Sequence, residues 1–252
     1  MIEYEHHPSA PPDTEAEGMK YRQRKLNVMK DYKYIFWDLD GTIINSYNGV
    51  TRSVQYALSK FGIDEQDPDT LRRYIGPPLR DSFQKISGLT REQADQGLDY
   101  YRERYNKIGL YECDLFPQVK ETLQYYQTKG KVQFLSSSKP EVMCRKILHN
   151  LKVDHCFDEI VGASLDGKID TKQEVLHEAF RRAESYSGKK RPPFQKDDVV
   201  LIGDTKFDAA GARQCGIDCI GVEYGFGTDE ELRENGVLGI ADDLQDLRKM
   251  LP

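Results

Sequence analysis

The sequence predicts an α/β fold, with a doubly wound parallel sheet and an all-helical insertion. From residue 33 onward, short apolar runs alternate with helix-like stripes, which is typical of parallel strands covered by helices on both faces. Strand-like runs are absent between about residues 48 and 114, where helical patterns continue. A chain of 252 residues is long enough for such a core and a smaller companion unit.

Five apolar runs are expected to be the strands of this sheet, because they are short and lack a helical period. The runs are Tyr34–Trp37, Val132–Leu135, Ile160–Val161, Val199–Ile202 and Cys219–Val222. Doubly wound sheets bind ligands beyond the carboxyl ends of their strands. Chemistry is therefore expected in the residues that directly follow each run.

Helical stripes separate the predicted strands. Pro117 is expected in the first turn of a helix that Gly130 ends, and Pro140 is expected to open the next helix. The apolar stripes are Val119, Leu123 and Tyr126; Met143, Ile147 and Leu151; Val175, Leu176, Ala179, Phe180 and Ala183; and Leu244, Leu247 and Leu251.

The helical insertion is expected to cover the strand ends as a lid, because it leaves after the first strand and returns before the second. Its stripes are Val50, Val54, Leu58 and Phe61, then Ala94, Leu98, Tyr101, Tyr105 and Ile108, with Thr90 and Gln93 at capping-box spacing. The predicted domains are a polar tail at residues 1–30, an α/β core at 31–47 and 115–252, and a helical cap at 48–114.

Composition limits the partners and the compartment. A formal net charge of -6 gives no long-range attraction for a polyanion, so nucleic acid is not expected as a main partner. No apolar run approaches the roughly 20 residues of a membrane span, and no secretion signal is visible, so we expect a cytoplasmic protein. The five scattered cysteines lack metal-site spacing and are expected to be reduced packing residues.

Two carboxylates follow the first predicted strand, in the stretch YIFWDLDGTII. Asp38 and Asp40 are costly beside apolar strands unless something binds them, and oxygen ligands favour Mg²⁺. Gly41 permits a sharp turn, and the Thr42 hydroxyl is expected to tie the loop. Isolated Asp-x-Asp pairs are common in turns, but DxDGT after a buried strand is a much more specific signal.

A second acidic site follows a later strand, in VVLIGDTKFD. If the strands are neighbours, Asp204 lies near the Asp38 loop, with Asp208 close behind. Without that loop, Asp204 would equally fit a turn and Asp208 a helix N-cap.

Two further strand ends carry polar groups. Hydroxyl and backbone N–H groups of Ser136, Ser137 and Ser138, just before a helix, would form an anion cradle; a serine-rich cap is the alternative. Lys172 stands near the start of a helix, where a cation opposes the macrodipole, so a purely structural role is slightly unfavourable there. A solvated lysine is the alternative.

Four stretches together resemble the signature motifs of the haloacid dehalogenase superfamily, which has a Rossmann-like core: YIFWDLDGTIINS, FLSSSKP, the lysine of GKIDTKQEV, and LIGDTKFDAAGA. The stretches YIGPPLRDSF, YRERY, SLDG and YGFGTDEEL are similar to the phosphoglycolate phosphatase and 5'-nucleotidase-like branch, which has a small helical cap. The resemblance runs from about residue 33 to 251.

The resemblance implies a Mg²⁺-dependent phosphatase acting on a small phosphate monoester. It implies Asp38 as nucleophile and Asp40 as general acid, and Mg²⁺ held by Asp38, the backbone carbonyl of Asp40, and Asp204. Asp208, Gly41 and Thr42 would support the site. Lys172 and a serine of 136–138, with Ser137 preferred, would hold the phosphoryl oxygens. Arg80 is a candidate for a second anionic group of the substrate, although a surface salt bridge is the favoured alternative.

Two other enzyme classes and two non-enzyme classes share parts of this pattern. A phosphomutase shares the four motifs, and a phosphonate hydrolase shares the fold but needs a cap lysine in a context not found here. Outside enzymes, a phospho-aspartate receiver domain is shorter and lacks the insert, and an idle binding protein would not need four competent motifs. We expect a monomer or homodimer that binds a small phosphorylated metabolite.

Overall fold

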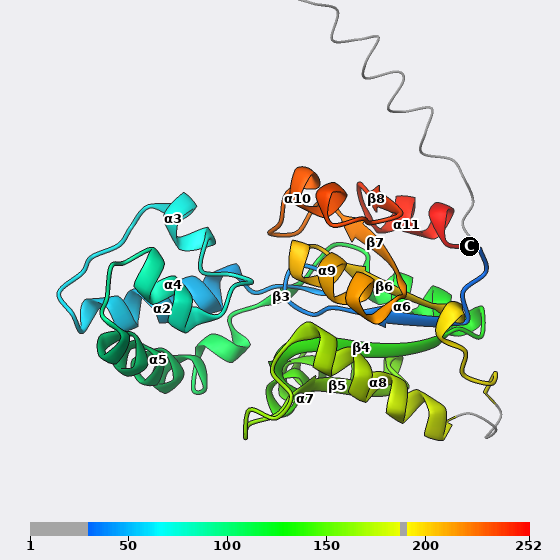
Figure 1. Ribbon diagram of the computed structural model, residues 1–252, viewed down its shortest axis with the longest axis horizontal. Coiled ribbons are helices and arrows are strands. Elements are labelled where there is room, and N and C mark those ends of the chain that lie inside the picture. The colour runs from blue at the N-terminus through cyan, green and yellow to red at the C-terminus, as the bar shows by residue number, and fades with distance from the viewer. Residues whose placement is uncertain (1–29, 187–190) are drawn as a thin grey trace, which may run out of the picture.

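The computed structural model describes residues 30–186 and 191–252, and these form a larger lobe built around a sheet and a smaller helical lobe (Figure 1). The predicted tail lies outside the described residues, except for Lys30. The strands of the larger lobe point their carboxyl ends toward the helical lobe (Figure 1).

Six parallel strands form the main sheet, in the spatial order β5-β4-β1-β6-β7-β8. They are β1 (Tyr34–Trp37), β4 (Val132–Pro140), β5 (Glu159–Ala163), β6 (Val199–Gly203), β7 (Asp218–Val222) and β8 (Gly239–Ala241). The central strand β1 pairs with β4 and β6, so that Trp37 lies opposite Leu135 and Ile202. The predicted doubly wound sheet is confirmed, and the ends of β1, β4 and β6 are neighbours.

Helices cover both faces of the sheet. They are α6 (Val119–Thr128), α7 (Glu141–Asn150), α8 (Lys172–Tyr186), α9 (Lys206–Cys215), α10 (Asp229–Glu234) and α11 (Leu244–Met250), with 3₁₀ turns η2 (Asp154–Cys156) and η3 (Lys196–Asp198). Successive β1 side chains point to opposite faces. Trp37 packs on the α6, α7 and α11 side, with its ring 6.0 Å from Tyr126, whereas Phe36 packs on the α8 and α9 side and stacks on Phe134.

The smaller lobe consists of α2 (Tyr47–Ser59), α3 (Pro68–Arg72), α4 (Leu79–Lys85), α5 (Arg91–Tyr105) and the 3₁₀ turn η1 (Gly109–Tyr111). The chain leaves and re-enters the larger lobe through a short antiparallel pair, β2 (Ile44–Asn45) and β3 (Asp114–Leu115). The predicted capping box of Thr90 and Gln93 begins α5. The cap boundaries at residues 48 and 114 stay a prediction.

Several local predictions were wrong. Pro117 precedes α6 instead of standing in its first turn, and Ile108 is 54% exposed instead of facing the cap core. Strand β4 continues through Ser136–Ser138, which were expected in a loop before a helix. Strands β2, β3 and β8 were not predicted, because two or three residues are too few to show a period.

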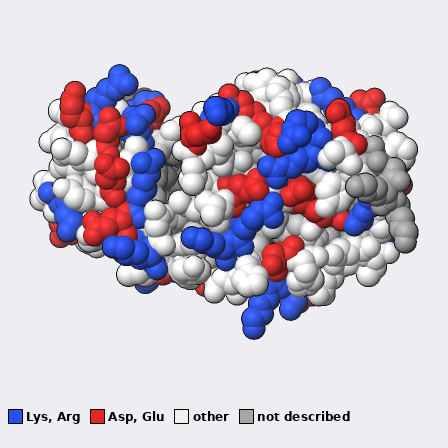
Figure 2. Space-filling model, turned by 90° about the horizontal axis from the view of Figure 1, so that it is seen from below, with Lys and Arg blue, Asp and Glu red and all other residues white. Residues whose placement is uncertain are grey.

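Charges on the face shown in Figure 2 are mixed in sign, and a notch separates the two lobes.

All five cysteines are free, and four of them are buried. Among the residues with a described structure, no helix combines the length and apolarity needed to span a membrane.

A fully buried glutamine links the sheet to α6. Gln133, on β4, accepts from the Trp37 indole N–H at 3.1 Å, and its amide donates to the carbonyl oxygens of Leu123 at 2.8 Å and Cys156 at 3.2 Å. Buried polar groups are costly when they lose their partners. This side chain therefore connects β1 and β4 to α6 and η2.

We predict that Gln133→Leu lowers the free energy of unfolding by about 3 kcal/mol, because one indole N–H and two carbonyl groups lose their partner while the volume is kept. Denaturant unfolding followed by circular dichroism would measure it. Gln96→Leu, on the exposed side of α5, should change the same quantity by less than about 0.5 kcal/mol. Equal stabilities of the wild type and Gln133→Leu would contradict this role.

Candidate active site

The loop after β1 places Asp38 at the centre of the strand ends. The Asp38 backbone N–H donates to the Ile202 carbonyl at 2.9 Å, which extends the pairing of β1 with β6. Gly41 has φ +89°, and a side chain there would begin 1.9 Å from a carboxylate oxygen of Asp204. Only glycine fits this conformation and this close approach, as the sequence predicted for the turn.

Lys172 is the first residue of α8 and is buried among acidic groups. Its ammonium lies 2.5 Å from an Asp38 oxygen and 2.7 Å from an Asp208 oxygen, and it also donates to the Ser136 carbonyl at 2.8 Å. Burial works against its charge, but Asp208 and Asp38 together raise the pKa of Lys172 above its ordinary value. Lys172 is therefore a fixed cation in the site.

Asp204 follows β6 and is fully buried. It accepts hydrogen bonds from the Thr42 hydroxyl at 3.1 Å and from the Phe226 backbone N–H at 2.8 Å. Asp208 lies one turn further on, where it accepts from the Thr205 backbone N–H at 3.1 Å and forms the capping box of α9. The N-cap of α9 is Thr205, so Asp208 as N-cap is wrong: Asp208 is the third residue of the capping box, and it lies close to the Asp38 loop as the other alternative predicted.

One carboxylate oxygen from each of Asp38, Asp204 and Asp208 lies within 4.8 Å of the other two. Three ionised carboxylates beside the one ammonium of Lys172 would carry a net charge of two negative units, so the donor set fits a hard divalent cation. Burial, then the neighbouring Asp208 and Asp40 charges, raise the pKa of Asp38 to about 7 against the opposing effect of Lys172. Burial, Asp208 and Asp38 raise the pKa of Asp204 well above its ordinary value.

Asp40 is not part of this triad and pairs with Lys139. The ammonium of Lys139 lies 2.9 Å and 2.8 Å from its two carboxylate oxygens, and the same ammonium donates to the Tyr105 hydroxyl at 2.7 Å. Burial opposes the charge of Lys139, but Asp40 and the two tyrosines Tyr105 and Tyr101 raise its pKa well above the ordinary value. Because Tyr105 belongs to α5, Lys139 connects Asp40 to the helical lobe.

The three predicted serines differ from one another. Ser136 is fully buried, and its hydroxyl has no hydrogen-bond partner among the described residues. Ser137 is 2% exposed and accepts from the Lys139 backbone N–H at 3.3 Å, whereas Ser138 is exposed. Pro140, which has no N–H, separates these serines from α7. The hydroxyls therefore lie along the end of β4, just before α7, and their role as an anion cradle stays a prediction.

Arg80 lies on α4 and pairs with Asp95 of α5 at 2.5 Å, with both side chains about half exposed. This contact is the surface salt bridge that the sequence left as the alternative. Its role toward substrate stays a prediction.

Sequence reasoning missed the residues that join the two lobes at the site. Lys139 appeared only within the stretch FLSSSKP, and Tyr105 was assigned only to a helix stripe. The stretch Tyr224–Gly227 was noted without a role, although its Phe226 N–H binds Asp204. A lysine directly after a serine run at a strand end was the one signal that pointed to Lys139.

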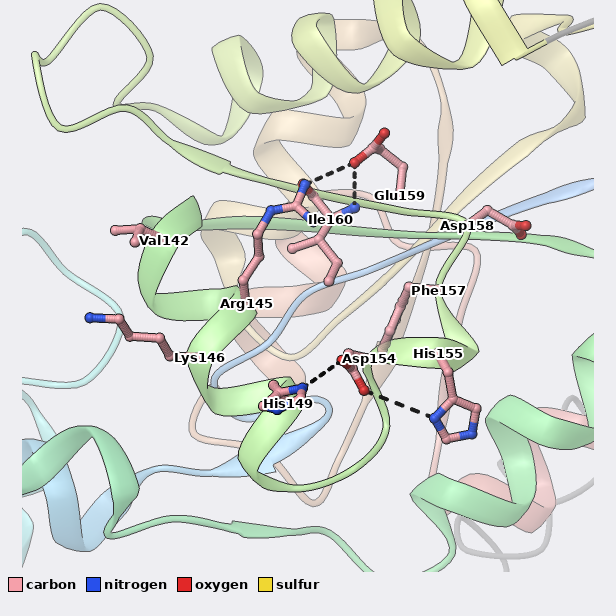
Figure 3. Close-up of a pocket in the computed structure, with 10 residues that line it drawn as sticks. All are labelled: Val142, Arg145, Lys146, His149, Asp154, His155, Phe157, Asp158, Glu159 and Ile160. Carbon is pink, nitrogen blue, oxygen red and sulfur yellow. Dashed lines mark hydrogen bonds and ion pairs between the residues drawn. The ribbon is translucent and has the colours of Figure 1, made fainter.

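A cavity of about 570 Å³ lies away from these groups, between α7, η2 and β5 (Figure 3). Two pairs of its lining side chains are in polar contact: Arg145 with Glu159 at 3.0 Å and His149 with Asp154 at 3.0 Å. His149 and His155 flank Asp154 from opposite sides (Figure 3). None of the predicted site residues lines this cavity.

Comparison with known proteins shows the family of this chain. The profile of haloacid dehalogenase-like hydrolases matches residues 35–222, and the chain belongs to that family. A 5'-nucleotidase of Pseudomonas aeruginosa is 36% identical over 220 residues, which cover 87% of this chain and 96% of that protein. A phosphoglycolate phosphatase of Haemophilus influenzae is 28% identical over 229 residues, covering 87% and 98%.

Solved structures show the same architecture. A crystal structure described as a predicted phosphatase from Clostridium acetobutylicum superimposes with a TM-score of 0.79 at 35% identity, and the match covers 87% of this chain and 98% of that one. The family, the named relatives and this neighbour together identify the chain as a phosphatase.

We predict that Gly211→Ala lowers kcat/KM by about 100-fold, since a displacement near 1 Å in a catalytic group has an effect of that size. A methyl group at position 211 on α9 would lie 2.5 Å from Cγ of Lys172 and would push its ammonium from Asp38. Gln214→Ala, on the exposed side of α9, should keep full activity. Unchanged phosphatase kinetics in folded Gly211→Ala would show that the position of Lys172 does not matter.

Proposed function

We propose that this protein hydrolyses a small phosphate monoester with the help of Mg²⁺, through an aspartyl-phosphate intermediate on Asp38. The observation that supports this most is the buried group of Asp38, Asp204 and Asp208 around Lys172 at adjacent strand ends. A structural ion cluster would not need two carboxylates in excess of its cations, whereas a site for a divalent ion and a phosphate would.

Mg²⁺ would be held by carboxylate oxygens of Asp38 and Asp204 and by the backbone carbonyl of Asp40, with Asp208 beside them. The ion would screen the negative charge of the phosphate as the carboxylate approaches it. Gly41 and Thr42 support this set: the first leaves room for Asp204, and the second donates to it.

In the first step, an Asp38 oxygen attacks phosphorus, and the bond between phosphorus and the ester oxygen breaks. Asp40 gives its proton to the departing oxygen, which leaves as an alcohol. In the second step, Asp40 takes a proton from water, the water oxygen attacks the phosphorus, and Asp38 is released with inorganic phosphate. Lys139 contacts Asp40 in the structure, which supports a fixed orientation for this side chain.

Lys172 and a hydroxyl of the serine run would bind the phosphoryl oxygens in both steps. Lys172 is already fixed by two carboxylates, so little reorganisation is needed when charge develops on phosphate. We keep Ser137 as the preferred hydroxyl because of its position two residues before Lys139. The unpartnered hydroxyl of Ser136 and the exposed Ser138 are the neighbouring candidates.

The substrate is proposed at the level of class. The relatives are named for phosphoglycolate and for 5'-nucleotides, and both are small phosphate monoesters. We propose residues 48–114 as a cap that closes over such a substrate, and Arg80 as a contact to its second anionic group. A cytoplasmic location, a monomeric or homodimeric state and the absence of a nucleic acid partner belong to the same proposal.

We predict that Asp38→Asn abolishes Mg²⁺-dependent release of phosphate from phosphoglycolate and nucleoside monophosphates, by at least about 10⁴-fold, because the amide is not a nucleophile. Colorimetric phosphate detection measures this loss. Asp99→Asn, an exposed acidic residue of α5, should behave as the wild type. Substantial turnover by Asp38→Asn, or an aspartyl phosphate trapped on another residue, would refute the assignment.

We predict that Asp40→Asn loses about 10² to 10⁴ in rate on an alkyl phosphate and clearly less on p-nitrophenyl phosphate. The nitrophenolate leaves without a proton, so the missing acid matters less for that substrate. The ratio of kcat/KM values for the two substrates checks this prediction. If both rates fall equally, Asp40 does not protonate the leaving group.

A further inference from the structure

A loop of the larger lobe wraps around Asp204. A side chain at Gly225 would begin 2.2 Å from Cβ of Asp204, and one at Gly227 would begin 2.1 Å from its carbonyl oxygen. Between these glycines, the Phe226 backbone N–H donates to an Asp204 carboxylate oxygen at 2.8 Å. The position of the 225–227 backbone therefore sets the orientation of the Asp204 carboxylate.

The same loop also touches the other acidic loop of the site. The Tyr224 hydroxyl donates to the Thr42 carbonyl at 2.9 Å, and the Thr42 hydroxyl donates to the second oxygen of Asp204. Both oxygens of Asp204 thus depend on one connected set of hydrogen bonds. A shift of this loop would move the carboxylate as a unit.

One cap residue holds the loop from outside. Arg72, at the end of α3, donates to the Gly225 carbonyl at 2.7 Å, and its guanidinium lies 5.6 Å from the centre of the Phe226 ring. Arg72 thus holds Gly225 by a charge-assisted hydrogen bond and Phe226 by a cation–π contact. The two contacts together fix the position of the Gly225–Phe226 peptide. Close by, a side chain at Gly76 of the helical lobe would begin 3.7 Å from the methyl group of Thr205, the residue after Asp204.

We propose that Arg72 is a positioning residue for Asp204: the helical lobe orients a metal-binding carboxylate through the Gly225–Phe226 peptide. The inference rests on the proposed function, since it takes Asp204 as a ligand of Mg²⁺. Among the described residues, Arg72 forms no ion pair with Asp38, Asp204 or Asp208 and contacts the site through Gly225 and Phe226. Its effect is transmitted by two hydrogen bonds in series, from its guanidinium to the Gly225 carbonyl and from the Phe226 N–H to Asp204.

Partners of metal ligands typically contribute 10- to 100-fold to metal affinity, and Arg72 acts one bond further out. We therefore expect Arg72→Ala to raise the dissociation constant for Mg²⁺ by about 10-fold. The measurement is calorimetric titration of the full-length protein with Mg²⁺ alone, without substrate. Arg72→Lys retains a donor and a charge and should restore most of the affinity.

Arg73→Ala is the matched control, because Arg73 is the next residue, is also exposed and, unlike Arg72, donates no hydrogen bond to the 224–227 loop within the described structure. Its Mg²⁺ affinity should equal that of the wild type. As a second measurement, the thermal midpoints of wild type and Arg72→Ala should agree in the presence of a chelator. Once Mg²⁺ exceeds the wild-type dissociation constant, the wild type should melt at the higher temperature, because a bound ligand stabilises by RT ln(1 + [Mg²⁺]/Kd) and the difference persists at saturation.

An equal dissociation constant for the wild type and Arg72→Ala would overturn the inference, and so would an equal increase in Arg73→Ala. An effect on the substrate KM with unchanged Mg²⁺ binding would make Arg72 a cap-docking residue only. If the wild type itself binds no Mg²⁺, both this inference and the proposed metal dependence fail. In contrast, activity retained by Asp38→Asn would count against the proposed chemistry alone.

Discussion

The ammonium of Lys172 is buried between the carboxylates of Asp38 and Asp208, and the rest of the site is arranged around this contact. Removing three charged side chains from water is expensive, and apolar residues of equal size would often be as stable or more so. A contribution to folding stability therefore does not explain why these charged residues are buried together. Fixed charges of opposite sign at the end of a parallel sheet suit a reaction in which negative charge accumulates on phosphate.

The backbone around the cluster is as constrained as the charges. A glycine faces three of the charged groups closely enough that a methyl group would collide with them: Gly41 faces Asp204, Gly203 faces Asp208, and Gly211 faces Lys172. Dense packing of this kind limits each side chain to one rotamer. The site thereby gains fixed geometry before substrate arrives, which reduces the reorganisation needed during catalysis.

The sequence predicted the parts of this arrangement that depend on local pattern. Strand periodicity and the rule for strand ends brought Asp38 and Asp204 to one edge, and the pairing of β1 with β6 confirmed that the two strands are neighbours. Contacts between lobes could not be predicted in this way. Lys139 with Tyr105 and Arg72 with Gly225 are separated by 34 and 153 residues, and no periodicity encodes such pairs. The sequence also predicted that the strand of Val132 ends at Leu135. Strand β4 continues through Ser136–Ser138, because polar residues can extend a buried strand when its last part borders a site.

The two contacts between the lobes end on different acidic groups. Tyr105 reaches Asp40 through Lys139, and Arg72 reaches Asp204 through the 225–226 peptide. A position of the helical lobe that keeps both contacts therefore orients the proposed acid and a proposed metal ligand together. Binding linkage is reciprocal, so if this position strengthens Mg²⁺ binding, then Mg²⁺ must favour the same position by an equal free energy. The cap would then act on the chemistry by aligning carboxylates, in addition to any exclusion of water.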